Sequence, residues 1–128
     1  MSKDENIQTF HLGRDHKLLK AEQYSFVFSR SKRFGNKSIT VLARGNDIGH
    51  PRLGLAISKK SAKRAVDRNR IKRIFRESFR LHQHKLPNVD IIAMCKTNVL
   101  NLNNTEMHEQ IELQWRFMRK KFKNTTTD

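Results

Sequence analysis

The pattern of apolar and polar positions in the first half of the chain predicts a short helix followed by two strands. Tyr24 and Phe28 stand four positions apart in the first apolar stretch, so both lie on one side of a helix. The β-branched segment 38–44 and the apolar segment 53–58 each predict a strand. Glycine, asparagine and proline between these two segments predict a hairpin with a long loop, and residues 31–36 predict a turn.

The second half of the chain predicts a long helix, a buried strand and a final helix. Residues 61–84 favour a helix, which Pro87 ends because proline lacks the N–H that would continue the hydrogen-bond ladder. Residues 89–96 are apolar enough for a strand buried on both faces. Cap residues at 103–105 predict the start of the last helix. Its apolar stripe is spaced by threes and fours: Met107, Ile111, Trp115, Met118 and Phe122.

This order of elements predicts one α+β domain, an α/β sandwich made of a small mixed sheet and three helices. The strand–helix–strand order across residues 53–95 implies a parallel strand pair joined by a helical crossover. A chain of 128 residues has the size of a single domain. We expect that domain to span residues 17–122, with a flexible N-terminal segment at 1–16 and a flexible tail at 123–128.

The charge balance adds a prediction about the partner. Lys and Arg number 27 against 12 Asp and Glu, which gives a formal net charge of +15. Self-repulsion of this size indicates an anionic partner, and nucleic acid is favoured over a membrane surface or an acidic protein. No stretch resembles a signal peptide or a membrane helix, and the single cysteine, Cys95, excludes disulfide and cysteine–zinc frameworks. These features predict a cytoplasmic protein that has no membrane partner.

The positive charge is concentrated on one side of the predicted long helix. Ten basic residues lie between positions 59 and 80, opposed only by Asp67 and Glu77. At ~100° per residue, one side of the helix carries Ile71, Ile74, Phe75, Ser78, Phe79 and His82. The opposite side carries Asn69, Lys72, Arg73, Arg76 and Arg80. A solvated helix normally interleaves acids at this spacing, so the pattern favours contact with phosphates.

Two local features refine this picture. The apolar phase of the helix does not extend back through residues 59–67, which predicts a separate turn there with Asp67 capping the helix. The chain also offers no cluster of carboxylates or histidines for nuclease chemistry, and His82 and His84 face different sides of a helix. We therefore expect neither a catalytic residue nor a metal site in this chain.

Two segments carry a resemblance to a known family. They are Arg52-Leu-Gly-Leu-Ala-Ile-Ser-Lys-Lys60 and Ala65-Val-Asp-Arg-Asn-Arg-Ile-Lys-Arg73, the second followed by Arg76-Glu77. Together they resemble the protein subunit of bacterial ribonuclease P, and the similarity runs from about Leu18 to Phe122. The resemblance implies removal of the 5′ leader from precursor tRNA by a ribonucleoprotein. It also implies that the RNA subunit holds the active site and its Mg²⁺ ions, and that the helical crossover is left-handed.

The resemblance also implies roles for particular residues. The family's basic motif, which binds the catalytic RNA, matches Arg68, Asn69, Arg70, Lys72, Arg73 and Arg76, with Lys59 and Lys60 beside it. The aromatic pair that lines the cleft for the single-stranded leader matches Tyr24 and Phe28. Leu42 stands at a sheet position that is aromatic in some members. The implied partners are therefore the catalytic RNA and precursor tRNA, and no protein partner is evident.

The residues by themselves leave two other functions open. A ribosomal or ribosome-assembly protein would be equally basic and would bind RNA without serving a reaction. A DNA-binding module could place the helix at residues 68–80 in the major groove, but such a module usually needs base-reading side chains and a dimer surface. The kind of nucleic acid that co-purifies with the protein distinguishes these functions.

Overall fold

The computed structural model describes residues 14–126. Residues 1–13, which make up most of the expected flexible N-terminal segment, and residues 127–128 lie outside this range. Regular structure begins with a short 3-10 turn, η1 (Arg14–His16), three residues before the expected start of the domain. Within the described range, no helix is both long enough and apolar enough to cross a membrane.

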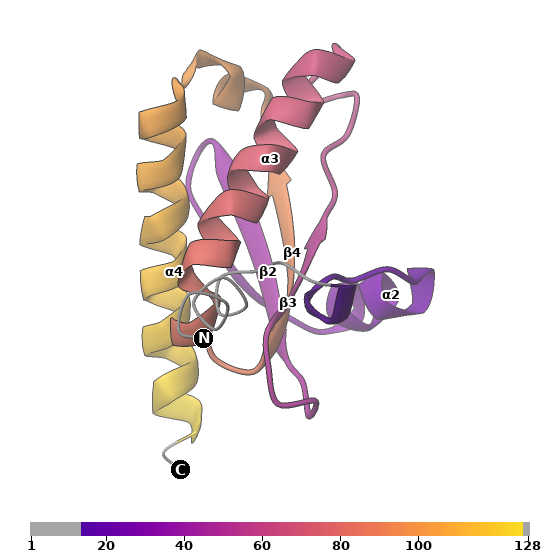
Figure 1. Cartoon of the computed structure of the whole chain (residues 1–128), viewed down its shortest axis with the longest axis vertical. Helices are drawn as coiled ribbons and strands as arrows, with labels where there is room; N and C mark the ends of the chain where they lie inside the picture. Colours follow the sequence, from indigo (N-terminus) through magenta and orange to yellow (C-terminus); the bar gives the residue numbers. More distant parts are fainter. Residues whose placement is uncertain (1–13, 127–128) are drawn as a thin grey trace, which may run out of the picture.

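A four-stranded mixed sheet forms the centre of the fold (Figure 1). Its strand order is β1-β2-β4-β3. β4 pairs antiparallel with β2 and parallel with β3, which confirms the predicted parallel pair. The strands are β1 (Lys32–Gly35), β2 (Ile39–Gly45), β3 (Arg52–Leu55) and β4 (Val89–Cys95).

The predicted hairpin between the strands at 38–44 and 53–58 is wrong. β4 lies between them, and the true hairpin joins β2 to β1, whose residues 31–36 were expected to form only a turn. β4 is buried along almost its whole length. A buried strand must also pair its backbone N–H and C=O groups, and a strand does so on both of its edges only when it lies between two other strands. β1 suits the sheet edge because Lys32 and Arg33 are exposed there, as is common for edge strands.

Among the described residues, three α-helices complete the fold: α2 (Ala21–Ser29), α3 (Ala65–His82) and α4 (Asn104–Thr126). The predicted cap at Asp67 is wrong, because α3 starts at Ala65 and Asp67 lies in its first turn. The predicted start of α4 is confirmed by reciprocal bonds, since Asn103 and Glu106 each accept the other's backbone N–H, at 2.8 and 2.9 Å. At its other end α4 runs to Thr126, into the expected flexible tail, because no glycine or proline stops it.

Two short 3-10 turns complete the connections around β4. η2 (Gln83–Lys85) follows α3 directly, and η3 (Thr97–Asn101) precedes α4. β4 therefore begins and ends in tight turns, so α3 and α4 return to the same face of the sheet.

The larger core lies between the sheet and the pair α3 and α4 (Figure 1). The predicted apolar sides of both helices are buried there except for His82, which is half-buried, and Cys95 is buried there too. Phe79 and Trp115 meet edge to face with ring centroids 6.2 Å apart, and the Trp115 indole donates a 2.9 Å hydrogen bond to the Ser78 hydroxyl. Because α3 buries this side, its basic side must face outward.

The opposite face of the sheet carries a smaller core beneath α2, formed by Leu18, Val27 and Ile92. α2 has only nine residues, so it covers only part of that face. Tyr24 packs there against Gly54, where a Cβ atom would lie 2.9 Å from the ring. Glycine at this position allows α2 to approach β3 closely, and this approach brings α2 near the basic side of α3.

Candidate nucleic-acid interface

The outward side of α3 holds cations that have no ion-pair partner among the described acids. Asn69, Arg73 and Arg76 are exposed and Lys72 is half-buried. None of the three cations forms an ion pair with a residue that the structure describes. The Glu77 carboxylate, on the same helix, lies 3.0 Å from the His108 imidazole of α4. Repulsion between like charges one turn apart therefore remains and favours an anionic partner.

Arg68 holds the turn that precedes α3. Its Nη1 atom donates to the backbone carbonyls of Ala62 and Lys63, at 2.9 and 2.8 Å. Ser61 anchors the same turn to β4 by donating a 2.7 Å hydrogen bond to the Cys95 carbonyl. Lys59 and Lys60 are exposed at the start of this turn, so Arg68 helps to set where these cations stand.

Arg70 joins α3 to the start of α4. Its Nε atom donates to Asn104 Oδ1 at 2.8 Å, and its Nη2 atom donates to the Leu102 carbonyl at 2.7 Å. The resemblance marks Arg68 and Arg70 as RNA contacts, yet both guanidinium groups are bound within the protein. The partners of Arg70 lie 32 and 34 positions away in the chain, so residue spacing could not reveal them.

A cavity of about 160 Å³ brings both groups of predicted residues together. Tyr24 of α2 lines it together with Lys72 and Arg76 of α3. Lys17 and Leu19 also line it, although neither was predicted as a site residue. The segment before α2 reaches this place because Leu18 donates a 2.9 Å backbone hydrogen bond to the Leu53 carbonyl. The cavity therefore combines cations with apolar walls at the edge of the sheet.

The two predicted leader-cleft aromatics have different surroundings. The Tyr24 hydroxyl accepts a 3.2 Å hydrogen bond from the Leu55 backbone N–H, and the ring belongs to the core beneath α2. Phe28 is 51% exposed and is not part of the cavity lining. Leu42 is half-buried in the same small core. Tyr24 thus serves as a fixed wall, whereas Phe28 offers an accessible ring.

No metal centre accompanies these residues in the described part of the chain. No group of three or more His, Cys, Asp or Glu side chains there is arranged to hold an ion. His82 Nδ1 lies 2.7 Å from the Ser78 carbonyl, which gives this ring a partner within its own helix. The chemistry of the site is therefore that of cations, amides and aromatic rings.

Comparison with known proteins decides the family. The family model described as Ribonuclease P matches residues 12–119, which include every residue of the candidate interface. The chain belongs to the ribonuclease P protein family. It is accordingly a protein component of the endoribonuclease ribonuclease P, and the ribonuclease P RNA is its partner.

Relatives and solved structures agree with this membership of the ribonuclease P protein family. The ribonuclease P protein components of Yersinia enterocolitica and Escherichia coli O157:H7 are each 48% identical over 103 residues, which cover 80% of this chain and 87% of the relative. The ribonuclease P protein of Staphylococcus aureus superposes with a TM-score of 0.75 at 26% identity, covering 80% of this chain and 94% of that one. That of Thermotoga maritima gives a TM-score of 0.68 at 25% identity, covering 78% and 96%.

The internal bonds of Arg70 generate a prediction for this ribonuclease P protein. Replacing Arg70 with Ala should lower the free energy of unfolding by about 1–2 kcal/mol, because Asn104 and the Leu102 carbonyl lose charged donors. Replacing Arg73 with Ala removes the same charge from an exposed position and should change the free energy of unfolding by less than about 0.5 kcal/mol. Urea unfolding of both variants measures the difference, and equal losses would contradict a clamping role for Arg70.

Proposed function

We propose that this protein binds the ribonuclease P RNA through the outward side of α3 and holds the single-stranded 5′ leader of precursor tRNA beside α2. One observation supports RNA binding by α3: Lys72, Arg73 and Arg76 have no acidic partner among the described residues. The exposed amide of Asn69 and the lysines at 59 and 60 extend this cationic surface.

Within this proposal the basic motif divides into two groups. Lys72, Arg73 and Arg76 contact phosphates directly, because their charges have no partner in the described protein. Arg68 and Arg70 act mainly through the protein by fixing the turn before α3 and the start of α4. The two clamps hold the contacting residues in register, so less ordering is required when RNA binds.

We further propose that the RNA subunit carries the catalytic step and its Mg²⁺ ions. The described residues do not fit a protein-bound metal, because no group of three or more His, Cys, Asp or Glu side chains among them is arranged to hold an ion. The contribution of the protein is then to bind and orient the two RNAs. A positively charged surface does this by reducing the repulsion between their phosphates.

Catalysis by the RNA predicts that the purified protein by itself does not process precursor tRNA. Protein freed of RNA by nuclease treatment and denaturing purification should leave the substrate intact, whereas adding back the RNA subunit at low Mg²⁺ should restore 5′ leader removal. Gel analysis of labelled precursor tRNA makes the measurement. Specific cleavage by the RNA-free protein would overturn the assignment.

Direct phosphate contact predicts a change in the salt dependence of binding. Affinity for the ribonuclease P RNA should fall steeply with salt, and replacing Arg73 or Arg76 with Ala should reduce the slope of log K against log salt by about one unit. Replacing Arg70 with Ala should reduce this slope less, because the Arg70 guanidinium is bound within the protein. Filter binding over a salt series tests this, and an unchanged slope for Arg73→Ala and Arg76→Ala would mean that these residues are only solvated.

Leader binding beside α2 predicts a selective effect at Phe28. Because this ring is 51% exposed, replacing Phe28 with Ala should leave folding nearly unchanged. It should weaken binding of precursor tRNA by about tenfold, since stacking of a base on an aromatic ring contributes on the order of 1–3 kcal/mol. Binding of mature tRNA, which lacks the leader, should barely change.

A matched control is available on α4 for the Phe28 experiment. Phe117 is 49% exposed, so Phe117→Ala removes an equally accessible ring from another surface. Affinities for precursors with and without a leader should be measured for both variants, together with their melting temperatures. Intact discrimination between the two substrates in Phe28→Ala would show that this ring does not contact the leader.

A further inference from the structure

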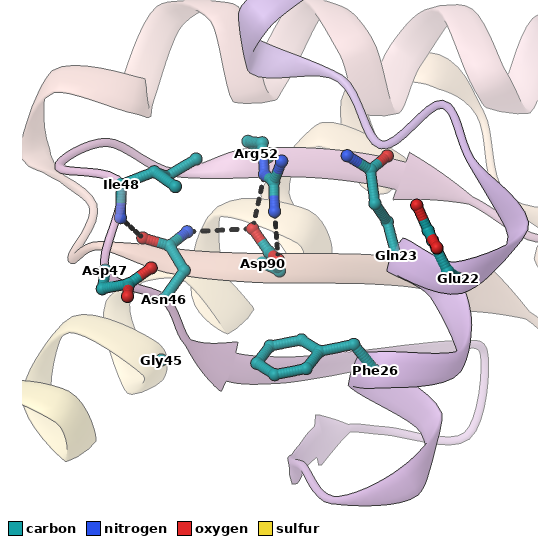
Figure 2. A pocket seen from close by; sticks show the side chains of 9 residues that line it. All are labelled: Glu22, Gln23, Phe26, Gly45, Asn46, Asp47, Ile48, Arg52 and Asp90. Atoms are coloured by element: carbon teal, nitrogen blue, oxygen red, sulfur yellow. Dashed lines mark hydrogen bonds and ion pairs between the residues drawn. The ribbon is translucent and has the colours of Figure 1, made fainter.

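A second cavity, of about 580 Å³, lies on the other flank of α2 (Figure 2). One wall is α2, from which Glu22 and Phe26 reach the cavity, and the facing wall is the loop after β2, which carries Asp47. The paired side chains of Arg52 and Asp90 lie between these walls. A cavity of this size is large enough for a nucleobase or a similar planar group.

The cations near this cavity are already bound within the protein. Arg52 forms a bidentate pair with Asp90, at 2.8 and 2.7 Å, and the bond to the carboxylate raises the pKa of Arg52 further above its usual value. Asn46 donates a further 2.9 Å hydrogen bond to Asp90. Arg44 donates a 2.6 Å hydrogen bond to the Phe26 carbonyl. The cavity is therefore not suited to bind a phosphate.

Phe26 offers an aromatic surface that the fold holds in place. The guanidinium carbon of Arg44 lies 3.6 Å from the ring centroid, so Arg44 covers one face of the ring. Phe26 remains 40% exposed and belongs to neither hydrophobic cluster, so its ring does not serve the core. A planar group that enters the cavity can stack on this ring.

The free charges in the cavity are those of two carboxylates, and the Gln23 amide, whose oxygen already accepts the Leu19 and Lys20 backbone N–H groups, also lines it. Glu22 and Asp47 are both exposed and form no ion pair or side-chain hydrogen bond with the described residues. Both carboxylates stay unpaired although the chain has a net charge of +15. A planar ligand that presents N–H donors at its edge therefore suits the ring of Phe26 and these two carboxylates.

We propose that this cavity binds an unpaired guanine base of RNA, an inference that rests on the proposed RNA-binding function and deepens it. The base stacks on Phe26, and its adjacent N1–H and N2–H groups donate to the Asp47 or Glu22 carboxylate. Guanine fits better than the other bases because only guanine places two neighbouring N–H donors on its Watson–Crick edge. Uracil has a single N–H between two carbonyls, which the carboxylates repel. Unpaired bases in RNA are commonly recognised by such stacking and edge contacts.

The test compares short uridine oligonucleotides that carry one guanine, one hypoxanthine or neither base. All three have the same charge, so contacts to phosphates cancel and the comparison reports the base alone. Fluorescence anisotropy with the full chain should show binding about tenfold tighter for the guanine oligonucleotide than for uridine alone. The hypoxanthine oligonucleotide, which lacks the N2 amine, should fall between them.

Substitutions in the cavity should remove this preference. Phe26→Ala removes the stacking ring, and the double variant Glu22→Gln with Asp47→Asn removes both anionic acceptors at exposed positions. The matched control is Glu109→Gln with Glu112→Gln, which makes the same change in net charge on the exposed surface of α4. Melting temperatures confirm that all the variants fold. The control should keep the guanine preference.

The outcomes separate this inference from the proposed function. Equal binding of the three oligonucleotides by the unchanged protein, or a guanine preference that survives in both cavity variants, would overturn the guanine site alone. Failure of the unchanged protein to bind any of them would instead count against the proposed function.

A final comparison identifies the source of the guanine. If it lies in the leader, the double variant should lose affinity only for precursors whose leader contains guanine. If it lies in the ribonuclease P RNA, the variant should bind that RNA more weakly whatever the leader. Loss of neither affinity would overturn the site.

Discussion

The packing of α3 against the sheet is the constraint on which the rest of the molecule depends. Ile71, Phe75 and Phe79 are fully buried in the larger core, so the rotation of the helix about its axis is set. The side opposite these residues then faces solvent, and it carries the cations of the interface. Any other rotation would expose large aromatic rings and bury unpaired charges, and both changes are costly. Stability and the outward orientation of the basic side chains therefore have one common cause.

The distribution of charge partners gives the fold a second level of organisation. Among the described residues, Asp90 is bound to Arg52 inside the protein, and Glu77 is engaged with His108. Arg68 and Arg70 use backbone carbonyls and an amide as partners. An acid, an amide and carbonyls thus satisfy the arginines that brace the structure, whereas Lys72, Arg73 and Arg76 of α3 have no acidic partner among the described residues. A partner rich in phosphates would neutralise these cations.

The short α2 helix divides one face of the sheet into two chemically different sides. Towards α3, Tyr24 borders a small cavity that also contains Lys72 and Arg76. On the other flank, Phe26 borders a larger cavity with free carboxylates. The first arrangement suits phosphates and the second suits the donor edge of a base. A helix long enough to cover the sheet would have filled both cavities, so the short length of α2 leaves both of them open.

Much of this structure could be predicted from the sequence because local periodicity determines which side of an element a residue takes. The buried side of α3, the stripe of α4, its cap at Asn103 and the burial of β4 all follow from spacing over a few residues. The family could also be inferred from contiguous motifs, since the segment around Arg68, Asn69 and Arg70 is short and specific.

Only the tertiary structure decided which distant residues meet. The insertion of β4 between β2 and β3 replaced the expected hairpin, because strand order depends on burying the most apolar strand and not on nearness in the chain. Other juxtapositions also join separate elements. Arg70 bonds to Asn104, Lys17 shares a cavity with Arg76, and Phe26 shares another with Asp47. Sequence spacing contains no record of such contacts, because they arise only when the elements pack against one another.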